Sequence, residues 1–423
     1  MNIVQSADEL IRFWFTSRDE YNEPVSNTVR EILKNIRKKG DTALYDYTQR
    51  FDYVDIKEIQ VAPEIIAVAE KKLNPAFRSI LEQAGENIRL FHKRQLPESW
   101  MDKSAHGIEL GQQYSPLESV GVYIPGGRAV YPSTMLMNCI PAQVAGVERI
   151  AIVSPPRQDG EISPVLLGCA GLIGINEVYR IGGAQAVGAL AFGTESVKPV
   201  AKITGPGNKY VNEAKKQVFG IVGIDLPAGP TEMVILADES AKPSFIIWDL
   251  LAQAEHDPDA QTAFLTTDLD LFKNVLNELN TAIEKSPRKE IIEKSLNEHG
   301  FALMIPSVSE GLEIINKLAP EHLELMVYNA DEAVKSIRNT GAIFLGNYSP
   351  GAVGDYWAGP NHTLPTDGAA AFASPLNVLD FMKFSSTIKY SMESLLRVKN
   401  AISAFAQTEQ LYAHAQSVEV RNG

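Results

Sequence analysis

Four of the seven histidines lie in short polar segments together with carboxylate or amide side chains. The four segments are Gln253-Ala-Glu-His256, Glu321-His322, Asp355 to His362, and Glu409 to His414. Imidazole nitrogens, carboxylate oxygens and amide oxygens are groups that bind zinc and move protons near neutral pH. Gln253 and His256 stand three apart after an apolar run, so on a helix both side chains project from one face. This spacing predicts a metal site, with Asp355 and His414 as candidates for the other ligands.

The pair Glu321-His322 has the chemistry of a general acid and base. It stands at the predicted start of a strand, opposite the loop that carries Asp355. A neutral histidine in that place can accept a proton from an alcohol, and a glutamate can activate a water molecule. The alternative for this pair is a surface position at the opening of a strand. The alternative for the Asp355 segment is a loop that an aspartate caps.

Three glycine-rich turns each follow a predicted strand and precede a predicted helix. They are Pro125-Gly-Gly127, Gly182-Gly-Ala-Gln185 and Gly205-Pro-Gly-Asn208. Such turns let backbone N–H groups and a helix N-terminus approach a pyrophosphate. A single turn of this kind is more often a packing feature, but three on one edge of a sheet favour a nucleotide site. Gln185 and Asn208 would then direct their amides at a ribose or a nicotinamide.

The elements that must position these residues alternate between β-branched runs and helical patterns. The first alternation has predicted strands at 120–124, 150–153, 178–181, 201–203 and 233–236, with helices such as 134–146 and 184–191 between them. The second has helices at 243–256, 268–283 and 308–318, and strands at 263–266, 301–305, 323–327 and 342–345. Strand–helix alternation with short connections predicts parallel sheets covered by helices. The predicted fold class is therefore α/β, with two incomplete Rossmann-like parallel-sheet domains.

The remaining segments differ in composition from these two domains. Residues 1–95 are charge-rich and predicted to be mostly helical, and residues 346–373 form a Gly/Pro-rich loop of a length typical of functional loops. Residues 374–423 are predicted to be mostly helical and carry Glu409 and His414. A terminal helix of this kind can complete a site that is built elsewhere, including one in a neighbouring subunit.

Composition excludes several classes of protein. The chain has 423 residues, enough for two or three domains, and its net charge of −13 argues against nucleic acid or an anionic membrane as the main partner. The apolar runs are too short to span a membrane, and the first residues do not have the pattern of a signal peptide, so we expect a cytoplasmic protein. Cys139 and Cys169 stand in apolar surroundings and are predicted to be buried and reduced.

The motifs together resemble those of the histidinol dehydrogenase family from about Asp41 to the C-terminus. The resemblance rests on Gly121-Val-Tyr-Ile-Pro-Gly-Gly, Arg180-Ile-Gly-Gly-Ala-Gln-Ala, Gly205-Pro-Gly-Asn, Ala228-Gly-Pro-Thr-Glu, Gln253-Ala-Glu-His-Asp, Pro320-Glu-His-Leu-Glu, Gly354-Asp-Tyr, Gly359-Pro-Asn-His-Thr-Leu-Pro-Thr and Glu409 to Ala415. It implies an enzyme that uses zinc and NAD to oxidise L-histidinol through the aldehyde to L-histidine. The family usually has serine where this chain has Thr231, so the hydroxyl is retained with an added methyl group.

The resemblance also implies roles for single residues. The zinc ligands, one ion per subunit, would be Gln253, His256, Asp355 and His414. Glu321 and His322 would be the catalytic acid/base pair. NAD would contact Tyr123, Gln185 and Asn208, whereas the substrate would contact Thr231, His362 and Glu409 beside the metal ligands and His322. The family further implies a homodimer with shared active sites.

These roles give a predicted division of the chain. Residues 1–20 form an N-terminal arm, residues 21–122 and 232–373 the domain with the zinc and acid/base residues, residues 123–231 the NAD-binding domain, and residues 374–423 a helical segment that completes the partner's site. A dehydrogenase of the same fold for another hydroxylated substrate, such as a sulfonated polyol, is the nearest alternative. Glu409 disfavours it, because a carboxylate suits an ammonium group better than a sulfonate. A non-catalytic metal- or nucleotide-binding relative is disfavoured by the intact Glu321-His322 pair.

Overall fold

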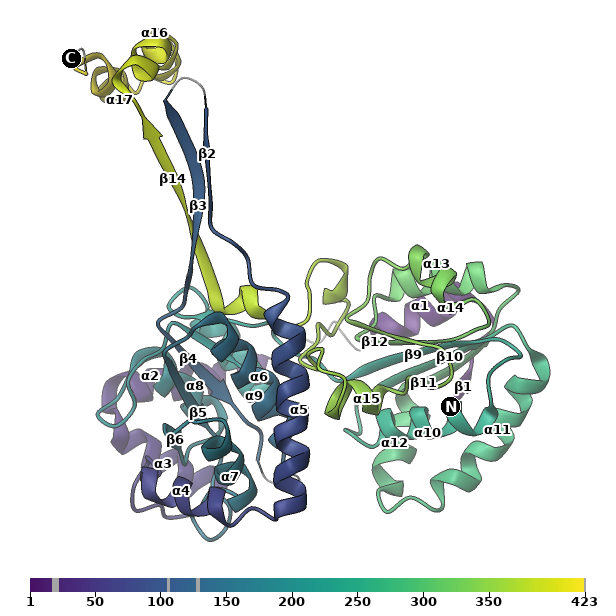
Figure 1. Ribbon diagram of the computed structural model, residues 1–423. Helices are drawn as coiled ribbons and strands as arrows, with labels where there is room; N and C mark the ends of the chain where they lie inside the picture. The colour runs from purple at the N-terminus through teal and green to yellow at the C-terminus, as the bar shows by residue number, and fades with distance from the viewer. Residues whose placement is uncertain (17–22, 105–106, 127–129, 422–423) are drawn as a thin grey trace.

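Two helix-covered parallel sheets lie side by side, and an antiparallel arm projects from one of them (Figure 1). The computed structural model describes residues 1–16, 23–104, 107–126 and 130–421. The predicted α/β class with two parallel sheets is confirmed. Cys139 and Cys169 are both buried and free, as predicted. No described helix is long and apolar enough to cross a membrane.

The first unit is built on a five-stranded parallel sheet with the order β6-β5-β4-β7-β8. Its strands are β4 (Ser119–Tyr123), β5 (Arg149–Val153), β6 (Val178–Tyr179), β7 (Lys202–Thr204) and β8 (Gly223–Ile224). One face packs against α4 (Pro63–Lys71), α5 (Pro75–Lys93), α6 (Pro132–Ala145) and α7 (Pro164–Leu172), and the other against α2 (Glu23–Lys39), α3 (Asp41–Asp52), α8 (Gly183–Phe192) and α9 (Lys209–Val218). Burial on both faces explains why the strands are runs of valine and isoleucine without polar alternation.

The structure corrects the predicted domain boundaries in this unit. Helices α2 to α5 were expected to belong with residues 232–373, but they pack on the five-stranded sheet. The apolar stripe of α2, which includes Val29 and Ile36, is buried where α2 contacts α8 and α9. The stripe of α5 packs in the same way on α6. Helical periodicity identified these buried faces, but it carries no information about which sheet a face covers.

The second unit is a six-stranded parallel sheet with the order β1-β11-β10-β9-β12-β13. Its strands are β1 (Asn2–Ile3), β9 (Glu232–Ala237), β10 (Gln261–Thr266), β11 (Gly300–Met304), β12 (His322–Met326) and β13 (Ala342–Leu345). It is covered by α1 (Ala7–Thr16), α10 (Pro243–Ala254), α11 (Leu269–Ile283), α12 (Lys289–His299), α13 (Val308–Leu318) and α14 (Ala330–Ala333). The expected N-terminal arm is therefore part of this unit, because β1 pairs with β11 and Trp14 of α1 is fully buried.

The projecting arm consists of β2 (Trp100–Lys103), β3 (Ile108–Pro116) and β14 (Met382–Tyr390), paired antiparallel in the order β14-β3-β2. Helices α16 (Met392–Thr408) and α17 (Tyr412–Glu419) sit at its far end (Figure 1). The prediction that residues 374–423 are mostly helical is thus wrong for β14. Side chains of this strand, such as Phe384 and Ile388, are exposed, so it lacks the half-buried alternation by which strands are found.

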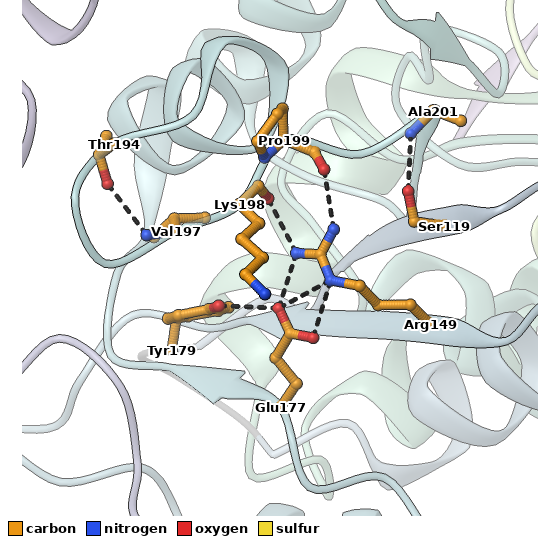
Figure 2. A network of polar contacts seen from close by, with 9 residues as sticks. All are labelled: Ser119, Arg149, Glu177, Tyr179, Thr194, Val197, Lys198, Pro199 and Ala201. Carbon is orange, nitrogen blue, oxygen red and sulfur yellow. Dashed lines mark hydrogen bonds and ion pairs between the residues drawn. The ribbon is translucent and has the colours of Figure 1, made fainter.

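A polar network ties together the amino-terminal ends of β5 and β6 (Figure 2). Arg149 donates to Glu177 at 2.7 Å and to the carbonyls of Lys198 and Pro199, each at 2.8 Å. Burial raises the pKa of Glu177, but hydrogen bonds from Arg149 and Tyr179 outweigh this effect and lower it. The charges satisfy one another at the end of the sheet, so this cluster is a structural network.

Candidate active site

The pair Glu321-His322 lies at the beginning of β12, as predicted, and is almost completely buried. The side chain of Glu321 accepts hydrogen bonds from the Thr231 hydroxyl at 2.6 Å and from the Glu232 backbone N–H at 2.9 Å. Nδ1 of His322 lies 3.0 Å from the Glu232 carbonyl oxygen and 3.5 Å from Oε2 of Glu321. A carbonyl oxygen only accepts, so this contact places a proton on Nδ1. In the neutral ring, Nε2 is then the atom with a free lone pair.

The electrostatic surroundings favour the protonated form of His322. Burial lowers the pKa of His322, but the negative charge of Glu321, its hydrogen bond and the charge of Asp355 raise it, with a net result of about 9. The same carboxylate that orients the ring therefore also makes it a stronger base. A histidine in this setting has the properties of a general base that works best in mildly alkaline solution.

Gln253 is joined to the acid/base pair through Thr231. It lies in α10 with 4% of its surface exposed, and its Nε2 donates to the Thr231 hydroxyl at 2.5 Å. Because its amide nitrogen has this partner, the remaining polar atom of its side chain is the carbonyl oxygen, which is the atom of glutamine that binds metals. The helix predicted at 243–256 ends at Ala254, so His256 lies in the turn after α10 and not on the helix with Gln253; its backbone N–H donates to the Gln253 carbonyl at 3.3 Å.

Asp355 stands in α15 (Gly351–Tyr356), a short helix within the segment that was predicted to be a loop. Its Oδ1 lies 3.6 Å from Nδ1 of His362. Burial raises the pKa of Asp355, but the hydrogen bond and charge of His362 outweigh this and hold it below its usual value. Asp355 and His256 line one pocket of about 320 Å³, and Asp355, His322 and His362 line another of about 880 Å³. Asp355 thus connects the predicted metal ligands to the acid/base pair.

The loop after Asp355 crosses from the six-stranded unit to the five-stranded one. Asn361 donates to the Met137 carbonyl at 2.5 Å, and the Thr366 hydroxyl accepts from the Gly229 N–H at 2.6 Å. Asn87 of α5 donates to the Trp357 carbonyl at 2.8 Å. These contacts hold the segment that carries His362 against both units, and His362 lines one pocket together with His322.

The donor set formed by Gln253, His256 and Asp355 fits a catalytic zinc ion. Nitrogen and oxygen ligands suit this metal, and three protein ligands leave a position open. In the part of the chain that the structure describes, no three or more His, Cys, Asp or Glu side chains cluster as a metal site. The set found here is consistent with that result, because one of its members is a glutamine and only two are of those types.

Glu409 and His414 are not brought to this site within the chain. Glu409 follows the last residue of α16 and His414 lies in α17, both at the far end of the arm (Figure 1). Both side chains are exposed there. The structure therefore places three of the four predicted ligands, Gln253, His256 and Asp355, in the six-stranded unit and the fourth, His414, at the far end of the arm.

The three predicted nucleotide contacts, Tyr123, Gln185 and Asn208, line one pocket of about 950 Å³. Gly126 and Gly183 line it too, and a Cβ at either position would meet a neighbour at 2.7 Å or less. Oε1 of Gln185 is buried without a hydrogen-bond partner among the described residues, which suits a ligand that donates to it. Asn208 caps α9 with its side-chain oxygen, so its amide N–H groups remain available. Gly127 lies outside the described residues.

The turn at Gly205 is held by a buried ion pair that sequence reasoning missed. Lys215 of α9 contacts Asp225 and donates to the Gly205 carbonyl at 3.0 Å, and Asp225 accepts from the Gly205 N–H at 2.8 Å. The φ angle of Gly205 is +109°, and a Cβ there would lie 2.1 Å from the Tyr123 carbonyl oxygen. Lysine and aspartate ten residues apart give no recognisable motif, so only the structure reveals this support.

Comparisons with known proteins agree with the site. A sequence model of the histidinol dehydrogenase family matches residues 16–422. The chain is 49% identical to a histidinol dehydrogenase of Bacillus subtilis over 96% of this chain and 95% of that protein, and 45% identical to one of Clostridium acetobutylicum over 95% and 93%. The crystal structure of histidinol dehydrogenase from Elizabethkingia anophelis is similar with a TM-score of 0.95 at 35% identity, covering 100% of this chain and 98% of that one.

The structure combines two helix-covered parallel sheets, the buried Glu321 and His322 at the start of β12, and a separate pocket lined by Tyr123, Gln185 and Asn208. The chain belongs to the histidinol dehydrogenase family.

Proposed function

We propose that this chain is a zinc- and NAD-dependent histidinol dehydrogenase, which oxidises L-histidinol through L-histidinaldehyde to L-histidine with two molecules of NAD. The observation that supports it best is the buried chain of hydrogen bonds from Gln253 through Thr231 to Glu321, with His322 beside it. These hydrogen bonds connect the proposed metal ligand Gln253, through the Thr231 hydroxyl, to the proposed acid/base pair. Such a link would place a residue that could hold the metal next to the groups that would take a proton from an alcohol.

His322 would remove the hydroxyl proton through Nε2 while hydride leaves the substrate carbon for NAD. Its Nδ1 contact with the Glu232 carbonyl fixes the ring during this transfer. Glu321 would then assist the addition of water to the aldehyde, because its carboxylate lies next to the same ring. Retaining the aldehyde between the two oxidations keeps a reactive carbonyl away from solvent.

Zinc would be held by Gln253, His256 and Asp355 of one chain. When bound, it supplies Lewis-acid polarisation of the substrate's amino and hydroxyl groups. His362, which contacts Asp355, and Thr231, which contacts Gln253, would both face the substrate. Thr231 has a second task, since its hydroxyl already donates to Glu321 and orients that carboxylate.

We further propose a homodimer in which His414 and Glu409 complete the site of the partner subunit. The arm that carries them leaves its own unit and exposes large apolar side chains, among them Ile388 at 71%, Phe405 at 70% and Tyr412 at 67%. An apolar surface of this kind marks a protein interface. A three-stranded arm with so little core of its own also gains stability when a second chain covers it.

The stoichiometry of the reaction tests the proposed function. Each L-histidinol should yield two NADH and one L-histidine, and a chelator should abolish the reaction until zinc is restored. A yield of one NADH with free aldehyde would contradict the two-step oxidation. Oxidation of a sulfonated polyol in preference to L-histidinol would support the alternative substrate class.

A further inference from the structure

The nucleotide pocket contains a carboxylate that the chain leaves partly unsatisfied. Asp52 is the last residue of α3 and lines this pocket together with Tyr123 and Gln185. Its Oδ2 is buried and has no hydrogen-bond partner among the described residues. Buried carboxylate oxygens in proteins nearly always accept from an N–H or O–H group. The donor is therefore expected from the molecule that occupies the pocket.

Among the described residues that line the pocket, no group balances the charge of Asp52. Arg157 and Asp159 are the other charged residues of the described lining, and these two form an ion pair with each other at the half-exposed rim. Burial raises the pKa of Asp52 to about 6, so the carboxyl group remains mostly ionised at neutral pH. The described lining thus presents the negative charge of Asp52 to a ligand, and this charge repels an anionic group that comes close to it.

The position of α3 indicates which end of a dinucleotide Asp52 meets. The nicotinamide must reach the substrate carbon beside His322, which belongs to the six-stranded unit. Helices α2 and α3 lie on the side of the five-stranded unit that is remote from the six-stranded one (Figure 1). Thr28 and Ile32 of α2 line the pocket together with Asp52. A dinucleotide with its nicotinamide towards His322 therefore has its adenosine towards α2 and α3.

We propose that Asp52 makes this enzyme select NAD over NADP, by accepting a hydrogen bond from the 2′-hydroxyl of the adenosine ribose and repelling a 2′-phosphate. The inference rests on the proposed function, in which this pocket holds the cofactor. An acidic side chain that binds the adenosine ribose is a recurrent solution in dinucleotide-binding folds. Here the carboxylate comes from a helix that precedes the sheet in sequence, so it lies outside the spacing by which such residues are recognised.

The ratio of kcat/KM for NADP to that for NAD tests the proposal in variants of the full-length enzyme. Asp52→Asn and Asp52→Ala should each raise this ratio about tenfold or more, because a hydrogen bond to a charged group is worth about this factor in affinity. The change should appear in the KM values of the two cofactors, with the KM for L-histidinol unaltered. Asp46→Asn is the matched control, because Asp46 is an exposed aspartate on the same helix and should leave the ratio unchanged.

Competition experiments on the wild-type enzyme test the same point without a variant. Adenosine 5′-monophosphate should compete with NAD at least tenfold more strongly than adenosine 2′,5′-bisphosphate. Equal inhibition by the two compounds, or an unchanged cofactor ratio in both Asp52 variants, would overturn the proposal. Wild-type enzyme that reduces no NAD with L-histidinol would instead contradict the proposed function, so the two failures are distinguishable.

Discussion

The hydroxyl of Thr231 donates to Glu321 at 2.6 Å and accepts from Gln253 at 2.5 Å. One side chain on the segment between the two units thus connects the base-orienting carboxylate to a proposed metal ligand. The family's usual serine has the same hydroxyl, which explains how threonine can stand here without loss of the connection.

Replacement of this hydroxyl should impair catalysis. Thr231→Val keeps the shape of the side chain but leaves Glu321 and Gln253 without their shared partner. A lost hydrogen bond to a charged group costs about 1.5–3 kcal/mol, so kcat/KM for L-histidinol should fall about 10- to 100-fold. Thr231→Ser is the matched control and should stay close to wild type. Wild-type activity of the valine variant in steady-state assays would show that the bridge has no catalytic role.

The pH dependence should follow the protonation of His322. Only the deprotonated ring can accept a proton, so kcat/KM should rise with pH on the acid side of its profile. Burial alone would lower the pKa of His322, but the charge of Glu321 raises it, with a net value of about 9. Glu321→Gln removes that charge, lowers the pKa of His322 and should move the rising limb to lower pH. A limb that stays in place would assign it to another group.

The pair Lys215 and Asp225 should matter for both stability and cofactor binding. Lys215→Met leaves Asp225 buried without its partner, which typically costs about 3–5 kcal/mol in the free energy of unfolding. The double variant Lys215→Met/Asp225→Leu removes both charges and should be more stable than the single variant. Because Gly205 loses one anchor in the single variant and both in the double variant, the KM for NAD should rise in both. Chemical unfolding and steady-state kinetics measure the two effects, and an unaltered KM would limit the pair to a structural role.

Zinc retention should depend on His256. His256→Ala removes one proposed ligand, and even changes outside the ligand set typically reduce metal affinity about 10- to 100-fold. The fold should survive, because His256 lies in a turn after α10 outside the buried clusters. Metal analysis and circular dichroism of the purified variant check both points. Stoichiometric zinc together with normal turnover would remove His256 from the site.

Mixing two inactive variants tests whether the arm serves the partner. His414→Ala and His256→Ala chains should each be inactive alone. In a mixed dimer with shared sites, one site combines the intact His256 of one chain with the intact His414 of the other. Activity should then return towards half of wild type per mixed dimer. With subunit exchange shown by mass spectrometry, a complete lack of activity would place His414 in the site of its own chain.

Sequence patterns identified the central strands of both parallel sheets because these strands are buried runs of β-branched residues, but they missed the two-residue edge strands β1 and β8. The prediction failed where burial is asymmetric or absent. Strand β3 contains glutamines and a glycine, and β14 exposes Phe384 and Ile388, so neither has a strand signature. The assignment of α2 to α5 to the wrong sheet has another cause. An apolar stripe shows that a helix is covered, but the covering surface is fixed by contacts distant in the chain.

In the site, too, local sequence patterns predicted some residues, whereas others are identified only by contacts distant in the chain. Glu321, His322, Gln253, His256 and Asp355 were predicted because they occur in dense polar segments, and the structure brings them together. Asp52 ends an ordinary amphipathic helix, and no neighbouring residue in the sequence marks it. Its importance depends on the buried oxygen and on the pocket that it lines, which only the fold creates.

The order in which the chain visits its sheets has a consequence for synthesis on the ribosome. Strand β1 pairs with β11, so Asn2 faces Phe301, and β3 pairs with β14, so Ile108 faces Tyr390. At a translation rate of about 5–20 residues per second, β11 is synthesised roughly 15–60 seconds after β1. During that time α1 has no sheet to cover, and Trp14 stays accessible to chaperones. Strand β1 and helix α1 are thus among the elements that reach their final place last.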